Sequence, residues 1–93
     1  MDIFVVELSN SAKKDLTIMP HYILDKFQGW VEAVERIGLK EVQKTPGYHD
    51  ESLKGKRKGQ RSVRLNKAYR AIYRIRKDDI EIVFVEELNK HDY

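Results

Sequence analysis

A dense cluster of cations interrupts the middle of the sequence. The stretch SLKGKRKGQR, residues 52–61, places four cations within five positions: Lys54, Lys56, Arg57 and Lys58. Residues 52–77 hold eleven of the eighteen Lys and Arg and none of the fifteen Asp and Glu, so the segment carries +11 against −8 for the remainder. Solvated surfaces usually intersperse both signs, and this segregation favours an anionic partner. Nucleic acid is the first expectation; an acidic protein segment and a plain solvated surface are the alternatives.

Side chains able to transfer protons flank this cationic segment. Glu51 and His49 precede it, and His91 and Tyr93 follow it near the end of the sequence. Cleavage of RNA by its own 2′-hydroxyl needs a base for the hydroxyl proton, an acid for the leaving 5′-oxygen and cations that stabilise the developing charge. The segment and its flanks supply all three. Each proton-transfer group taken alone is more often an incidental surface residue.

The sequence offers no constellation for a metal or another cofactor. Its three histidines stand at positions 21, 49 and 91, none forms a helical pair with a carboxylate partner, and cysteine is absent. We therefore expect chemistry without a cofactor. The absence of cysteine also fits a reducing compartment, with the cytoplasm as the default. Residues 3–6 and 82–85, the longest apolar runs, are too short to cross a bilayer, and no leader is recognisable.

Hydrophobic periodicity predicts the first elements that must position these groups. Residues 3–6 are rich in β-formers and apolar on both faces, which predicts a strand covered on both sides and ending near Leu8. Residues 9–11 supply side-chain acceptors for a helix start, and Pro20 bounds that short helix. From there to Gly38, apolar residues recur at spacings of three and four, which predicts a longer amphipathic helix.

The second half of the sequence predicts a loop followed by strands. Residues 39–59 carry weak order signals and three glycines, whereas residues 60–65, 69–76 and 80–88 are β-rich and joined by short connections. Period two in the middle run separates two sets of side chains, namely Tyr69, Ala71, Tyr73 and Ile75 on one face and Arg70, Arg74 and Arg76 on the other. Residues 1–93 thus predict a single two-layer α+β domain with an open arginine face.

Four motifs together resemble the RelE/ParE superfamily of bacterial type II toxins, particularly its RelE, YoeB and HigB-like messenger RNA interferases. They are SAKKDL in the first helix, ESLKG at the loop, YRAIYRI in the central strand and NKHDY after IEIVFV. The resemblance covers nearly the whole chain. It implies a β-α-α-β-β-β domain in which a helical hairpin packs on a curved, mainly antiparallel four-stranded sheet, with the active site on the opposite face.

The resemblance also implies roles for individual residues. Arg70 matches the central-strand arginine that contacts the scissile phosphate, and Glu51 stands where the YoeB branch places a general base. His91 and Tyr93 resemble the terminal His and Tyr of YoeB- and HigB-like chains, although Asp92 separates them, and which of the two transfers a proton stays open. The residues expected to bind phosphate or RNA are Lys54, Lys56, Arg57, Lys58, Arg61, Arg64 and Arg74.

The leading functional hypothesis is a toxin that cuts messenger RNA in the ribosomal A site, by 2′-hydroxyl attack and without a metal. Its implied partners are a cognate antitoxin, messenger RNA and the 70S ribosome, with operator DNA reached only through the antitoxin complex. A ParE-like inhibitor of DNA gyrase is the second hypothesis, and a non-catalytic RNA-binding module is the third. The presence of Glu51 together with the terminal His91 and Tyr93 favours the first hypothesis, because a protein that only binds needs no proton-transfer groups.

Overall fold

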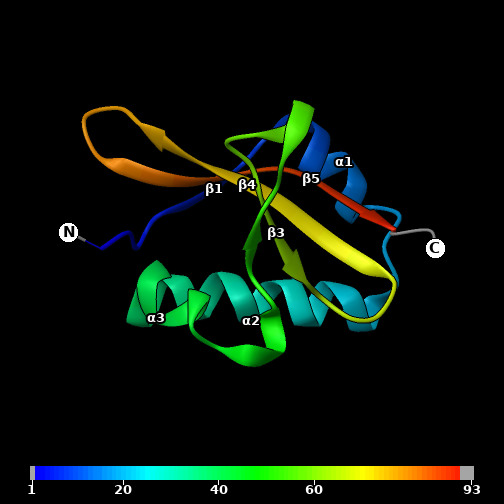
Figure 1. Cartoon of the computed structure of the whole chain (residues 1–93). Helices are drawn as coiled ribbons and strands as arrows, with labels where there is room; N and C mark the ends of the chain where they lie inside the picture. Colours follow the sequence, from blue (N-terminus) through cyan, green and yellow to red (C-terminus); the bar gives the residue numbers. More distant parts are fainter. Residues whose placement is uncertain (1, 91–93) are drawn as a thin grey trace.

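A computed structural model describes residues 2–90 and shows a strongly twisted sheet with helices packed on it (Figure 1). The α-helices are α1 (Asn10–Leu16), α2 (His21–Ile37) and α3 (Leu39–Gln43). The strands are β1 (Val6–Leu8), β2 (Glu51–Ser52), β3 (Arg61–Arg64), β4 (Tyr69–Lys77) and β5 (Glu81–Lys90). The sheet order is β1-β5-β4-β3-β2, in which β1 runs parallel to β5 and all other neighbours are antiparallel. The predicted α+β class is confirmed.

The two predicted helices form where their signals placed them. The Ser9 hydroxyl accepts a hydrogen bond of 2.9 Å from the backbone N–H of Ala12 and so caps α1. Gly38 ends α2 with a backbone φ of +89°, a conformation that side chains other than glycine rarely adopt. A Cβ atom at this position would also clash with the carboxylate of Asp2. Gly38 is therefore required both by its backbone and by its neighbour.

The core lies between the helices and one face of the sheet. Trp30 of α2 is fully buried, with its ring centroid 5.5 Å from that of Tyr73 and 5.9 Å from that of Phe27. The sheet contributes to this core the apolar side chains of Val63, Leu65, Ala71, Tyr73, Val83 and Val85. Ala71 and Tyr73 thus lie on the face that period two predicted, whereas Ile75, predicted for the same face, is 36% exposed. This single core fixes the strands whose opposite face carries the candidate site.

The segment between α2 and β3 contains more structure than its sequence predicted. Besides α3 it forms two single-turn 3-10 helices, η1 (Pro46–Tyr48) and η2 (Gly55–Arg57), and the short strand β2. Strand β2 pairs with β3 through Glu51 opposite Ser62, so the sheet has five strands where four were expected. Two residues are too few to produce a period-two pattern, which is why the sequence reads as a loop there.

The first strand begins later than its apolar run. The carbonyl of Ile3 accepts a hydrogen bond of 2.9 Å from the N–H of Leu39, which draws the start of the chain toward α3 and away from the sheet. Strand β1 consequently begins at Val6. Phe4 and Val5 are 47% and 37% exposed, so the expectation that this run is covered on both faces is wrong.

A β-bulge in β5 changes which side chains reach the face opposite the core. Ile72 pairs with Glu87 and Tyr73 pairs with Val85, which leaves Glu86 without an opposite residue in β4. Strict alternation would put only one of the two neighbouring glutamates on this face. The extra residue lets Glu86 and Glu87 both reach it, because Leu88 then returns to the core. The arginine face is therefore not the acid-free surface that the sequence predicted.

Candidate functional site

Two carboxylates of β5 pair with predicted RNA-binding arginines. The Glu86 carboxylate accepts 2.8 Å hydrogen bonds from Nε of Arg74 and from the amide of Gln60, and Glu87 lies 3.0 Å from Arg57. Partial burial opposes ionisation of Glu86, but these two donors outweigh it and hold the pKa of its carboxyl below the ordinary value. Arg74 and Arg57 are thus positioned by acids that lie far away in the sequence.

Three lysines of the basic stretch keep their charge available. Lys54, Lys56 and Lys58 are exposed on and around η2, and within residues 2–90 none of them has an ion-pair or hydrogen-bond partner for its ammonium group. Mobile exposed ammonium groups suit contacts with a polyanion backbone, which are electrostatic and tolerant of geometry. The cationic character of the stretch therefore survives folding at its lysines.

A cavity of about 290 Å³ opens on the face opposite the core. Strands β2, β3, β4 and β5 and the loop around η2 all contribute to its lining, which consists of Glu51, Leu53, Arg57, Ser62, Arg70, Ile72 and Asn89. Two residues assigned separate catalytic roles from the sequence, Glu51 and Arg70, thus line one cavity. The strand register explains this, because Glu51 lies opposite Ser62, Ser62 opposite Ile72, and Arg70 opposite Asn89.

The guanidinium group of Arg70 is held in place by the turn before its strand. Its Nη1 donates hydrogen bonds of 2.9 Å to the carbonyl of Asn66 and 3.2 Å to the carbonyl of Tyr69. The side-chain oxygen of Asn66 in turn accepts from the N–H groups of Ala68 and Tyr69, at 2.8 and 2.9 Å, and so fixes the turn. Arg70 is half-buried and preorganised at the edge of the cavity.

Glu51 has a potential proton-transfer partner in its own loop. Nε2 of His49 lies 3.4 Å from Oε2 of Glu51, and both side chains are more than half exposed. His49 has a left-handed backbone, with φ at +44°, which is uncommon for a residue other than glycine. This conformation turns the chain between η1 and β2 and places an imidazole beside the carboxylate at the mouth of the cavity.

A buried polar network anchors the residue that precedes Glu51. The Asp50 carboxylate is fully buried; its Oδ1 accepts a 2.6 Å hydrogen bond from Nε of Arg61 and its Oδ2 a 2.6 Å hydrogen bond from the Tyr73 hydroxyl. The amide of Gln43 donates to the same hydroxyl at 3.0 Å. Burial, reinforced by the bond to Asp50, raises the pKa of the Tyr73 phenol. The network ties the loop that carries His49 and Glu51 to the core.

The other predicted site residues lie in different environments. Arg61 is on the helix-covered side of the sheet, opposite Tyr73 in the register, and its guanidinium is engaged by Asp50. Arg64 lies opposite Arg70 on the cavity side, and its Nε is buried without a hydrogen-bond partner in the part of the chain described. His91 and Tyr93 lie outside the described residues, and their roles stay predictions.

Sequence reasoning missed several residues of the site. Asn89 has a recognisable signal, since it opens the NKHDY motif and pairs with Arg70. Asp50 has none, because a carboxylate in a loop is usually solvated. Glu86 and Glu87 fall outside the acid-free segment and reach the site through the bulge alone.

Residues 2–90 contain neither a cluster of metal ligands nor a membrane-spanning helix. No group of three or more His, Cys, Asp or Glu side chains among them could hold a metal ion. No helix in this part of the chain is long and apolar enough to cross a membrane.

Comparisons with solved structures show that bacterial and archaeal toxins share the fold of this chain. Its fold is similar to that of the RelBE2 toxin–antitoxin complex of Mycobacterium tuberculosis, with 21% identity, a TM-score of 0.69, and 96% of this chain and 99% of that chain covered. YafQ of Escherichia coli has 18% sequence identity to this chain and a TM-score of 0.72, and the match covers 91% of this chain and 90% of that chain. The archaeal RelE–RelB complex of Pyrococcus horikoshii has 19% sequence identity to this chain and a TM-score of 0.70. The match covers 94% of this chain and 93% of that chain.

No curated protein matches the chain significantly in sequence. The family model described as the ParE toxin of the type II toxin–antitoxin system parDE matches residues 6–88, from β1 through all but the end of β5. This range includes Glu51, Arg57 and Arg70, and it stops just before Asn89. The resemblance to the RelE/ParE superfamily is thereby confirmed, and the chain belongs to the ParE toxin family of type II toxin–antitoxin systems.

Proposed function

We propose that this toxin is an endoribonuclease that cuts messenger RNA on the ribosome. The observation that carries the proposal is the shared cavity of Glu51 and Arg70, which brings a carboxylate base to a preorganised guanidinium. Transfer of a proton and stabilisation of an anionic phosphorane are the two needs of RNA cleavage by the 2′-hydroxyl. A surface used only for binding requires neither the carboxylate nor its position beside an arginine.

Each bond change can be assigned to a group of the cavity. The Glu51 carboxylate takes the proton of the 2′-hydroxyl as that oxygen attacks the neighbouring phosphorus, and the phosphorus bond to the 5′-oxygen breaks. Arg70 and Arg57 stabilise the charge on the non-bridging oxygens, and the Asn89 amide supplies a further donor at the same cavity. The products are a 2′,3′-cyclic phosphate and a 5′-hydroxyl, which gains its proton from an acid.

Residues at the end of the chain would supply the acid that protonates the leaving 5′-oxygen. His91 and Tyr93 are the predicted donors, because they resemble the terminal His and Tyr of YoeB- and HigB-like chains and lie two and four residues after Asn89. His49 is a second source of this proton, because its imidazole lies beside the Glu51 carboxylate and can pass the proton from Glu51 to the leaving 5′-oxygen. A Glu–His pair of this kind returns the base to its starting state after each cleavage.

The remaining cations would bind the substrate assembly. Lys54, Lys56 and Lys58 project from the loop around η2 beside the cavity, where phosphates of messenger or ribosomal RNA can neutralise them. An antitoxin with an acidic segment would compete for the same lysines and silence the toxin. The relatives from Mycobacterium tuberculosis and Pyrococcus horikoshii are themselves toxin–antitoxin complexes, which supports such a partner here. Operator DNA would be reached only through that complex.

The family match gives support to one competing function. Because the matching family is ParE, inhibition of DNA gyrase without any chemistry is the second candidate. A supercoiling assay and a translation-coupled cleavage assay on the same purified toxin separate the two. Inhibition of supercoiling with intact messages would replace the proposed function.

The decisive experiment maps cut sites by primer extension on a message that is being translated. Wild-type toxin should cut at A-site codons, and naked RNA should be cut far more slowly. Replacing Arg70 by Ala should lower the cleavage rate by roughly two to three orders of magnitude, because a preorganised donor to the transition state is lost. Glu51→Gln should have a comparable effect. Arg36→Ala, an exposed position near the end of α2, is the control and should cut normally. Uncut messages with folded wild-type toxin would refute the proposal.

A further inference from the structure

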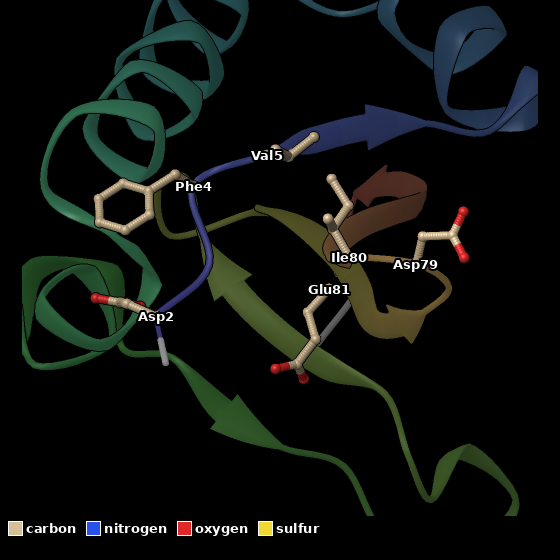
Figure 2. A pocket seen from close by; sticks show the side chains of 6 residues that line it. All are labelled: Asp2, Phe4, Val5, Asp79, Ile80 and Glu81. Carbon is tan, nitrogen blue, oxygen red and sulfur yellow. The ribbon is translucent and has the colours of Figure 1, made fainter.

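A second and larger hollow lies at the opposite end of β5 from Asn89. It has a volume of about 470 Å³ and opens between the extended start of the chain and the turn that joins β4 to β5 (Figure 2). The lining consists of Asp2, Phe4, Val5, Asp79, Ile80 and Glu81. None of these residues has a role in the proposed cleavage reaction.

The walls of this hollow are apolar and exposed. Ile80 is 57% exposed, Phe4 47% and Val5 37%. Isolated apolar side chains are common on protein surfaces, but a contiguous group around a concavity marks an interaction site.

The rim of the hollow is acidic. Asp2, Asp79 and Glu81 supply three carboxylates, and among the residues that the structure describes no Lys or Arg is part of the lining. The Asp2 carboxylate is fixed in place, since its Oδ1 accepts hydrogen bonds from the N–H of Lys40 at 3.0 Å and of Ile3 at 2.8 Å. The bond from Lys40 is the main reason that the pKa of Asp2 lies below its ordinary value. The rim therefore attracts cations and repels nucleic acid, acidic peptides and anionic membranes.

The backbone along one wall has free hydrogen-bonding groups. The N–H of Val83 donates to the carbonyl of Val5 at 2.9 Å, and the pairing between the start of the chain and β5 stops there. Within residues 2–90, the N–H groups of Phe4 and Val5 and the carbonyl of Phe4 have no hydrogen-bond partner. Unpaired groups on an extended, exposed segment are a template for another extended chain.

We infer that this hollow binds an extended segment of a partner protein in which apolar side chains alternate with Lys or Arg. The apolar side chains would contact Phe4, Val5 and Ile80, the cations would pair with the carboxylates, and the main chain would bond to the free backbone groups. A second copy of this chain fits poorly, because its own run of apolar residues that alternate with arginine, residues 69–76, already lies in β4 between two neighbouring strands of its own sheet. Such a head-to-tail contact would also fail to close into a dimer.

The test is an NMR titration of the isotope-labelled full-length toxin with a short capped peptide of alternating Lys and Val. The amide signals of Phe4, Val5, Ile80 and Glu81 should shift in a saturable manner. The double variant Asp79→Lys with Glu81→Lys should raise the Kd about tenfold or more, since two attractions become repulsions. The variant Glu32→Lys with Glu35→Lys changes the net charge equally on the exposed face of α2 and should leave the Kd unchanged.

Three results would overturn the inference. The first is a set of shifts that map to the β3–β4 surface or fail to saturate. The second is equal binding of a peptide of alternating Glu and Val. The third is concentration-dependent shifts of these same amides without any peptide, which would make a second copy the occupant. The amide spectrum itself reports whether each variant is folded, and none of these outcomes depends on RNA cleavage.

Discussion

The buried network around Asp50 should make Tyr73 unusually important for stability. Tyr73→Phe keeps the ring in the core but removes the hydroxyl that donates to Oδ2 of Asp50 at 2.6 Å and accepts from Gln43 at 3.0 Å. Among the described residues, the fully buried carboxylate then retains Arg61 as its one side-chain donor. Leaving a buried group short of a partner costs about 1–3 kcal/mol, and more when the group is charged. We expect a loss of about 2 kcal/mol in the free energy of unfolding, or roughly 10 °C in Tm for a domain of this size.

Urea denaturation of matched variants measures this loss. Tyr69→Phe is the control, because Tyr69 packs against the same core while its hydroxyl has no hydrogen-bond partner among the described residues; it should change stability by less than about 0.5 kcal/mol. Asp50→Ala should cost about 3 kcal/mol or more, since it leaves Arg61 and Tyr73 without their acceptor. In the Asp50→Ala background, Tyr73→Phe should lower the free energy of unfolding much less than it does in the wild-type protein. Equal effects of Tyr73→Phe and Tyr69→Phe would refute the reasoning.

Two further predictions concern the backbone and the pH dependence. Gly38→Ala should lower the free energy of unfolding by about 2–4 kcal/mol, because its φ of +89° is strained for alanine and the methyl group meets Asp2. Gly29→Ala, in open space on α2, should instead stabilise the protein by about 0.5–1 kcal/mol, and a similar loss in both variants would contradict the argument. Because the pKa of Tyr73 is raised on folding, stability should be intact below pH 10.0, the ordinary pKa of tyrosine, and fall as pH rises above it. Tyr73→Phe should flatten this alkaline slope in urea titrations, and an unchanged slope would exclude Tyr73 as its source.

Periodicity and capping signals predicted α1 and α2, but not the short helix α3. Ser9, Gly38 and the apolar spacing of α2 act locally, so a sequence window contains the information that determines them. The meeting of Glu51 and Arg70 could also be anticipated from motifs, although the cavity depends on a strand of only two residues. Local signals thus identified the parts of the site without its full geometry.

The charge distribution at the site could not be predicted in the same way. The segment at 52–77 contains no acid, yet Arg57 and Arg74 are paired with Glu87 and Glu86 because a bulge turns both glutamates to one face. Asp50 looked like an ordinary loop carboxylate, and its burial depends on Arg61 and Tyr73 from two other strands. Such contacts depend on register and on one inserted residue, neither of which leaves a periodic signal.

The parallel pairing of β1 with β5 has a consequence for the order in which this domain can form during its synthesis. The first strand of the chain finds its neighbour only in the last strand, with Val6 opposite Val83. Long-range pairing of this kind delays folding until the distant partner is available. Asn89, which lines the cavity, comes from that same last strand. A nascent chain from which β5 has not yet emerged therefore has neither the neighbour of β1 nor a completed cavity.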